Sequence, residues 1–508
     1  MLHPESTSSA LDPDPSYGAI KEPIIKVLQY MKAMEYKQTP HDRMFYPKLS
    51  GMVAKVGQMA HESPDQFGFF LTDYTEPGQL AQSGLTGGPA QILTFSTTVS
   101  MTEGFFALSR NGLSGQDNGF GSNNWGTSVL SPGDSSESNG YLDYAATGST
   151  NTEISQDVAN MLTAGRLSND AVAQVATALD SETTPDLKTR LAQQLISTSP
   201  EFHTTNIVER TADDRVPSPR QERSSDGYKA VVVIMLSGGW DAFNVLTPHT
   251  TCTNLYPSYR ANRGGLALGD DEMLPIVNDD PNQPCTTFGI HNSIPIFKEI
   301  YDDGYGQFHA NIGHLAKPVT KRNWYTETRT HLFSHATMER EAQLVDAFQE
   351  DGWSTGVGGR MLDILQSYNQ SVNAIGIDEK GPIIEGNPFT GRKVDVIPSA
   401  SINLLTRRSF SEPYNTDLSA IEPVMEYLNK DSTLSSGVFA DYWSQNLVDT
   451  LNKTVELNDW INNQPLVHTF SGYSVSKKLK MVAKMMMLNE ERQVNKDFFY
   501  LKKVRLLF

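Results

Sequence analysis

A strand followed by two glycines and an acid is the part of this sequence whose residue types could do chemistry. Residues 229–236 read Lys-Ala-Val-Val-Val-Ile-Met-Leu, and Ser237-Gly-Gly-Trp-Asp241 follows directly. Such a β-branched run predicts a central strand of a covered sheet, and paired glycines allow a tight turn. Asp241 would then stand at the carboxyl end of the strand, where α/β proteins usually place their ligands. Its carboxylate could ligate a metal ion, or it could cap the next helix.

Ser334 and His335 form a second candidate group. A serine hydroxyl at a helix N-terminus can serve as a nucleophile. Serine is also one of the commonest helix N-caps, and a helix is expected over residues 339–350. The N-cap is the favoured interpretation of Ser334, and Thr320 and Thr337 remain alternative hydroxyls.

Two histidines and an arginine lie near other expected strand or helix ends. His291 and His314 could each ligate a metal ion, but a hydrogen-bonded loop histidine is the more common arrangement. Arg360 follows Gly358-Gly359. It either binds an anion or forms a surface salt bridge.

Composition excludes some functions. A net charge of −18 predicts no nucleic-acid surface, because phosphate binding requires clustered Lys and Arg. No apolar run approaches the roughly 20 residues of a membrane span, and the first residues do not predict a signal peptide. The two cysteines, Cys252 and Cys285, could form one disulfide in an oxidising compartment or remain free thiols.

The remaining patterns predict alternating elements in the second half of the chain. Apolar spacing predicts a helical stretch over 17–62 and helices at 154–164, 168–180, 186–198, 293–303, 339–350, 356–369 and 476–490. Strands are expected at 229–236, 307–312 and 372–377. This alternation indicates an α/β fold, with a mostly parallel sheet covered by helices.

The chain is long enough for several domains. We expect a helical N-terminal segment at 1–107, a Gly/Ser/Asn-rich loop or disordered insertion at 108–152, and a helical segment at 153–210 that completes the N-terminal domain. A polar, Arg-containing linker at 211–228 would precede the α/β domain at 229–508.

Five motifs in the second half give it a resemblance to a known family. They are Ser237-Gly-Gly-Trp-Asp-Ala-Phe-Asn244, Phe288-Gly-Ile-His-Asn292, Asn311-Ile-Gly-His-Leu-Ala-Lys-Pro-Val-Thr320, Leu332-Phe-Ser-His335 and Gly356-Val-Gly-Gly-Arg360. In this order they resemble the mostly bacterial family called domain of unknown function fifteen hundred and one, over residues ~229–500. That family belongs to the alkaline phosphatase and sulfatase superfamily.

The first half resembles the C-terminal part of a second, largely helical family, domain of unknown function eighteen hundred. The matching segments are Lys21-Glu-Pro-Ile-Ile-Lys-Val-Leu28, Glu62-Ser-Pro-Asp-Gln-Phe-Gly-Phe-Phe70, Asp73-Tyr-Thr-Glu-Pro-Gly78, Leu162-Thr-Ala-Gly-Arg-Leu167 and Ser199-Pro-Glu-Phe202. Bacterial members of the two families are often neighbouring proteins. The resemblance therefore implies a fusion of partners that act together.

The resemblance implies an alkaline-phosphatase-like fold and hydrolysis of phosphoric or sulfuric esters at a divalent metal site. Asp241 is the matching first metal ligand, and Ser334-His335 match the catalytic Ser-His segment. An acid expected two positions after that histidine is replaced by Thr337.

In the family, the strand matching 495–501 leads into a Gly-Gly-Phe-Asp-Thr-His turn. Here Lys502-Lys-Val-Arg-Leu-Leu-Phe508 follows. The resemblance thus implies an incomplete domain, in which strand 495–501 is a poorly covered edge. We expect a hydrolase-like protein that is inactive as this fragment and holds no metal. The alternative is a non-catalytic binding or surface protein on the same scaffold. An anionic ester is the implied substrate. The bacterial relatives tend to be exported, so the resemblance implies an exported or extracytoplasmic protein.

Overall fold

The computed structural model covers residues 1–508. The residues described below are 14–38, 52, 56–58, 63, 68–114, 120, 138–220, 222–237, 241–310, 312–313, 315–328, 332, 334–346, 355–399 and 418–504. The chain forms two compact units. The first unit comprises Met1–Val233 and Trp353–Leu501, and the second comprises Ile234–Gly352 and Lys502–Phe508.

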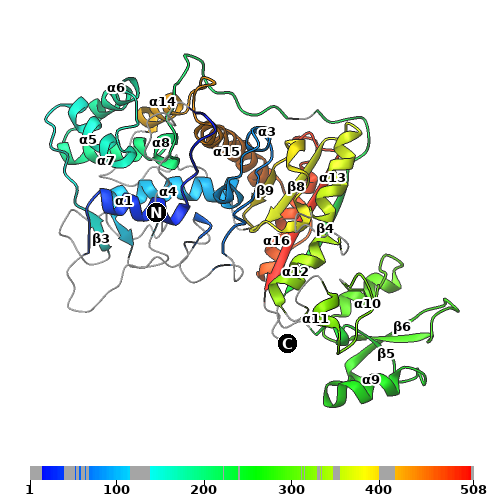
Figure 1. The fold of residues 1–508 in the computed structure, drawn as a ribbon. Coiled ribbons are helices and arrows are strands. Elements are labelled where there is room, and N and C mark those ends of the chain that lie inside the picture. The colour runs from blue at the N-terminus through cyan, green and yellow to red at the C-terminus, as the bar shows by residue number, and fades with distance from the viewer. Residues whose placement is uncertain are drawn as a thin grey trace. The chain divides into compact units, whose positions relative to one another are not determined.

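Helices make up the N-terminal part of the first unit (Figure 1). They are α1 (Pro23–Ala33), α3 (Gln79–Gln82), α4 (Phe95–Asn111), α5 (Asn151–Thr163), α6 (Asn169–Ala178), α7 (Pro185–Ile196) and α8 (Pro200–His203). Side-chain caps start many of them, as at α5, where Thr150 and Glu153 form a capping box. A small antiparallel sheet of order β1-β3-β2 (Tyr36–Gln38, Ser138–Leu142, Leu113–Ser114) accompanies these helices.

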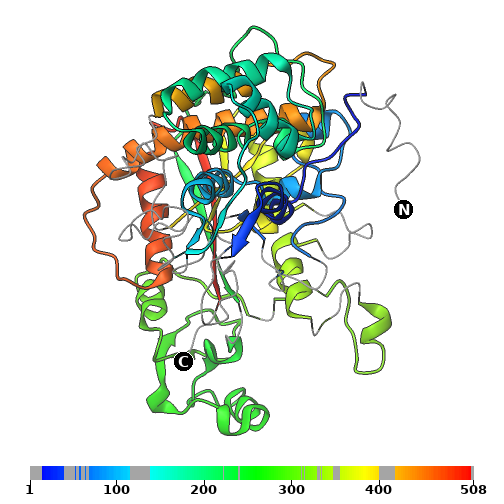
Figure 2. The same ribbon diagram turned by 90° about the vertical axis from the view of Figure 1, so that its left-hand side faces the viewer.

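Two helices from the second half of the chain complete this helical core. Figure 2 shows the orange helices α14 (Leu418–Leu428) and α15 (Val438–Asn463) among the teal helices α5–α8. The fully buried Trp443 of α15 belongs to the same apolar cluster as Tyr30, Phe105 and Phe202. The helical core is therefore built from segments that lie far apart in the sequence.

Residues 211–218, expected to be a linker, are fastened to α14 and α15. Arg215 donates to the carbonyl of Asn429 (3.2 Å) and forms an ion pair with Asp441. Ser218 donates its backbone N–H and its hydroxyl to Asp449, both at 2.7 Å. Residues 211–218 are therefore held against α15 and the residue that follows α14.

Most of a four-stranded parallel sheet lies in the first unit, in agreement with the α/β prediction. Its strands are β4 (Lys229–Ser237), β10 (Lys496–Val504), β8 (Val372–Ile377) and β9 (Val394–Ile397), in that order. In β10 the side chains of Phe498 and Phe499 alternate between faces. Phe498 lies beside Gly358 of α13 (Val357–Ser367). Phe499 packs in the cluster that holds Met481 and Val482 of α16 (Ser474–Met487), so the two helices cover opposite faces.

Three expectations about strands are wrong. The first is that β4 would be a central, covered strand. Instead β4 lies at the edge of the sheet, and its Val231 and Ile234 side chains are about 40% exposed. The second concerns strand 495–501, which is not an edge: β10 lies between β4 and β8. The third is the strand expected at 307–312, because residues 307–310 and 312 have no strand structure.

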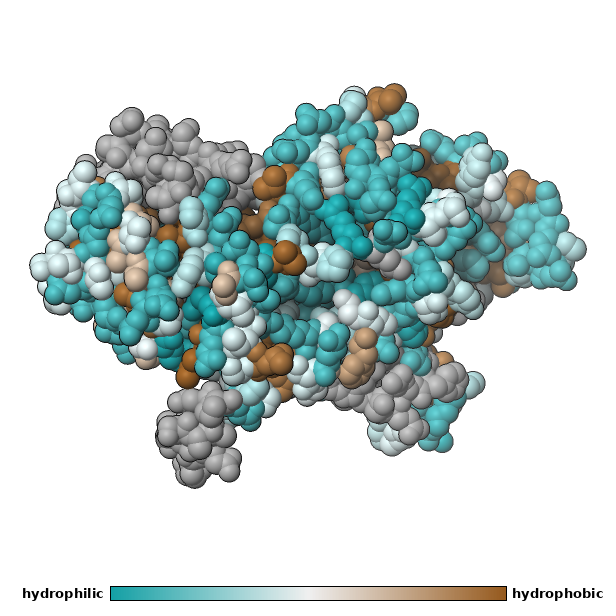
Figure 3. Space-filling model, turned by 90° about the horizontal axis from the view of Figure 1, so that it is seen from above, coloured by the Kyte–Doolittle hydropathy of each residue, from teal (hydrophilic) through white to brown (hydrophobic). Residues whose placement is uncertain are grey.

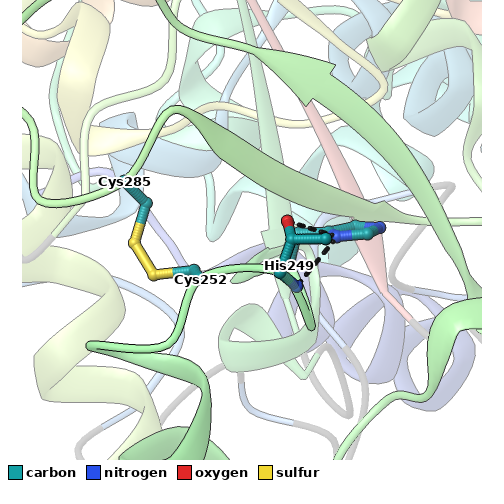
Figure 4. Close-up of a disulfide and its surroundings, with 4 residues drawn as sticks. His249, Cys252 and Cys285 are labelled. Atoms are coloured by element: carbon teal, nitrogen blue, oxygen red, sulfur yellow. Dashed lines mark hydrogen bonds between the residues drawn. A yellow bond between two sulfur atoms is a disulfide. The ribbon is translucent and has the colours of Figure 1, made fainter.

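The second unit is built around an antiparallel sheet of order β5-β7-β6. Its elements are β5 (Leu246–Pro248), α9 (Tyr256–Arg263), β6 (Met273–Val277), β7 (Thr287–His291), α10 (Pro295–Asp302), α11 (Trp324–Glu327) and α12 (His335–Leu344). Cys252 and Cys285 form a disulfide, with their Cα atoms 5.6 Å apart. Figure 4 shows this bridge near His249, whose carbonyl accepts from the N–H of Cys252 at 2.8 Å. The disulfide joins the loop after β5 to the segment that enters β7.

Short 3-10 helices occur at Gly88–Ile92, Leu179–Ser181, Ala242–Asn244, Gly264–Leu266, Asp270–Glu272, Pro382–Ile384 and Pro388–Thr390. Within the expected helical stretch 17–62, the described helix of several turns is α1, and it is followed by β1. None of the helices in the described residues is long and apolar enough to cross a membrane. On the face drawn in Figure 3, hydrophilic residues predominate and apolar ones are scattered.

Candidate functional site

Asp241, the expected metal ligand, lies in the second unit at the start of the 3-10 helix Ala242–Asn244. Its carboxylate accepts the backbone N–H of Phe243 at 3.2 Å and forms an ion pair with Arg263 at the end of α9. The guanidinium of Arg263 also lies 5.7 Å from the centre of the Phe243 ring. Asp241 therefore caps the 3-10 helix, which was the alternative to metal binding, and its carboxylate is paired with the guanidinium of Arg263. The Gly-Gly turn before Asp241 falls outside the described residues.

Ser334 is the N-cap of α12, as the favoured interpretation predicted. Its hydroxyl accepts the backbone N–H of Thr337 at 3.4 Å and lies 2.9 Å from the Thr337 hydroxyl. His335 is the first residue of the helix and is exposed. Among the described residues, the contacts of Asp241 and those of Ser334 have no residue in common.

The other expected side chains have local partners. His291 Nδ1 accepts the N–H of Ser293 at 3.1 Å, as in a hydrogen-bonded loop histidine. Thr320 donates its hydroxyl to Asn323 at 2.7 Å. Arg360 donates to the carbonyl of Thr355. His314 falls outside the described residues.

A hydrolytic metal ion does not fit the residues that the structure describes. Structural and catalytic zinc sites use three or four protein ligands. No group of three or more His, Cys, Asp or Glu side chains that could hold a metal ion occurs within the described ranges. At Asp241, moreover, a metal ion would compete with the guanidinium of Arg263 for the same carboxylate.

A charged cluster that the sequence analysis missed lies at the carboxyl end of β8. Asp378 has a left-handed backbone, with φ +67°, and its carboxylate accepts the N–H and hydroxyl of Ser399 at 2.6 and 2.8 Å. The ammonium of Lys478 from α16 lies 3.4 Å from both Asp378 and Glu379. A non-glycine residue in this backbone region is uncommon and strained, and such residues concentrate at functional sites.

Lys380 links this cluster to a buried tyrosine from the N-terminal half. Its ammonium donates to the hydroxyl of Tyr74 at 2.7 Å and lies 3.2 Å from Glu385. Tyr74 donates in turn to Glu76 at 2.5 Å. Burial, followed by the charge of Glu76, raises the pKa of Tyr74 well above its usual range. Tyr74 is therefore a protonated hydrogen-bond donor at neutral pH, and the network fastens residues 74–76 to the segment that follows the carboxyl end of β8.

A signal for this cluster was present in the sequence. Asp378-Glu379-Lys380 follows directly after the correctly predicted strand 372–377, at the strand end where ligands gather in parallel sheets. The partners Tyr74 and Lys478 are distant in sequence, and no local pattern identifies them. Because each of these charged groups already has a partner of opposite charge or a hydrogen-bond partner, the cluster is suited to holding the backbone in place.

A second buried titratable group lies in the helical core. Lys26 of α1 is fully buried, with its ammonium 4.9 Å from the Trp443 ring centre and no hydrogen-bond partner in the described structure. His203 stacks on the same ring at 3.4 Å and contacts the carbonyl of Ser197 at 2.7 Å through Nε2. Burial, and then the charge of Lys21, hold the pKa of Lys26 well below its usual range. Burial, and then Lys26, likewise lower the pKa of His203.

Comparison of the chain with protein-family models, with curated proteins and with solved structures finds no match in any of the three.

Proposed function

We propose that residues 229–500 form an alkaline-phosphatase-like α/β module that acts, in this chain, as a non-catalytic binding scaffold. The four-stranded parallel sheet with helices α13 and α16 on opposite faces supports the fold part of the proposal. The order of the five sequence motifs supports the relationship to the phosphatase and sulfatase superfamily. Because one fold hosts many functions, the binding role is argued from the site.

The ion pair between Asp241 and Arg263 is the observation that carries the non-catalytic part of the proposal. In the implied hydrolase, a divalent cation would neutralise this carboxylate and stabilise the charge on the transferring group. Here the guanidinium of Arg263 neutralises the carboxylate of Asp241. Unlike a metal ion, a guanidinium has no coordination position at which a substrate oxygen could bind. Ser334, the implied nucleophile, is already engaged as a helix cap.

A metal-dependent phosphoric or sulfuric ester hydrolase is the second candidate function. The position of Asp241 favours it, because this residue follows β4 of a parallel sheet by only a few positions. Under this alternative, Asp241 would exchange Arg263 for a metal ion and for further ligands.

A hydrolysis assay separates the two candidates. The full chain is incubated with 4-nitrophenyl phosphate or 4-nitrophenyl sulfate in the presence of Mg²⁺, Mn²⁺ or Zn²⁺. We expect no metal-dependent release of 4-nitrophenol above the level of Asp241→Asn. Metal-dependent turnover that Asp241→Asn abolishes, and that Asp271→Asn leaves intact as a matched exposed-acid control, would establish the hydrolase instead.

A further inference from the structure

An open, solvent-facing cavity of about 350 Å³ lies between α16 and the segment that follows α15 in the first unit. Lys480 and Lys484 of α16 line one side, and His468, Thr469 and Phe470 of the preceding segment line the other. Gln464 and Leu466 complete the lining. Three of these side chains are basic and none is acidic, in a chain whose net charge is −18.

The two lysines face the same side of the helix because they are four residues apart. Lys484 donates to the carbonyl of Ile461 at 2.7 Å, whereas Lys480 has no ion-pair partner in the part of the chain that the structure describes. Burial, followed by the like charge of Lys480, lowers the pKa of Lys484. Two cations held side by side without a carboxylate are stabilised by an anion between them.

The rest of the lining defines what such an anion would carry. The hydroxyl of Thr469 and the amide of Gln464 can donate hydrogen bonds to oxyanion oxygens. Phe470 and Leu466 offer apolar contact beside them. Most of the lining is polar or basic, which suits a charged group, and the two apolar side chains lie in the same lining. The volume is within the range of sites for small organic ligands.

We propose that this cavity is a binding site for a small phosphate- or sulfate-type oxyanion carried on an apolar group. Lys480 and Lys484 bind the oxyanion, and Phe470 contacts the apolar part. Because the overall negative charge repels anions at long range, these local groups supply the attraction. The site is in a different unit from Asp241 and does not depend on the proposed function.

The test is calorimetric titration of the full chain with phenyl phosphate, phenyl sulfate, inorganic phosphate and phenol. Phenyl phosphate or phenyl sulfate should bind more tightly than inorganic phosphate, and phenol should not bind. Lys480→Met should weaken the affinity for phenyl phosphate by about tenfold or more, which is the loss expected when a hydrogen bond to a charged group is removed. Lys477→Met, on the same helix but outside the cavity lining, is the matched control and should bind as the original chain does.

Two further variants sharpen the assignment. Phe470→Ala should remove the preference for phenyl phosphate over inorganic phosphate. Lys484→Met should weaken the binding of both phenyl phosphate and inorganic phosphate. Because this variant also loses the hydrogen bond to the carbonyl of Ile461, its thermal unfolding is measured as a control. Absence of phenyl phosphate and phenyl sulfate binding at millimolar concentration overturns the proposal. Equal weakening by Lys477→Met and Lys480→Met also overturns it, since that result indicates only general surface charge.

Discussion

Lys26 shows how one side chain can set the pH dependence of a whole core. Its amine is fully buried beside Trp443, and its pKa is lowered by burial and then by Lys21. The unfolded chain binds a proton at this lysine up to pH ~10.4, the ordinary lysine value, while the folded chain releases it at lower pH. Burying Lys26 therefore lowers the free energy of unfolding most at and below its lowered pKa. This destabilisation diminishes as pH rises and disappears above pH ~10.4.

Lys26→Met should consequently stabilise the protein at neutral pH. Its advantage over the original chain should shrink as pH rises from the lowered pKa of Lys26 toward pH ~10.4, by up to about 1.4 kcal/mol for each pH unit, because only the unfolded chain holds the proton in that window. Urea unfolding at several pH values measures this difference. Lys32→Met, at an exposed position of the same helix, should show no such trend. A pH-independent difference for Lys26→Met would mean that Lys26 stays charged in the folded state.

At the scale of elements, Gly358 fixes how closely α13 approaches the sheet. A Cβ atom built at this position would lie 2.5 Å from the Phe498 ring of β10, closer than real contacts allow. Phe498 is 3% exposed and has little room to move. Gly358→Ala should therefore destabilise the first unit by about 1–3 kcal/mol, the usual cost of overpacking.

Gly227→Ala is the matched control for this substitution, because none of the described residues, apart from its own chain neighbours, lies within 4 Å of the Cβ position there. Denaturant midpoints of the two variants give the comparison. Equal midpoints would show that α13 can shift away from β10 without cost.

Local patterns predicted many elements of this fold but not their neighbours. The helices expected at 154–164, 168–180 and 186–198 form because their apolar faces repeat and capping residues precede them. The run of valines in β4 predicted a strand correctly, yet its burial depends on which strand lies beside it. Of the candidate site residues, Ser334 could be assigned as a cap from its spacing. The pairing of Asp241 with Arg263 could not, because they are 22 residues apart.

On the scale of the whole molecule, the helical N-terminal part shares its core with the second half of the chain. Trp443, Ile421 and Leu428 belong to the same apolar cluster as the helices before residue 204. A fragment of residues 1–228 should therefore lack a cooperative unfolding transition, since it exposes the surface that α14 and α15 cover. Circular dichroism during urea titration tests this. A sharp transition in the fragment would show that the segment at 211–228 separates autonomous domains after all.

The position of Trp443 in this core also has a consequence for biosynthesis. Its partners Tyr30 and Phe202 leave the ribosome long before it does, because roughly 240 residues separate Phe202 from Trp443. At ~5–20 residues per second, the first helices wait on the order of tens of seconds with an apolar surface uncovered. During that interval we expect the uncovered apolar surface to make the nascent chain prone to aggregation and dependent on chaperones. The rate of translation between these two segments therefore influences how much of the protein reaches its native state.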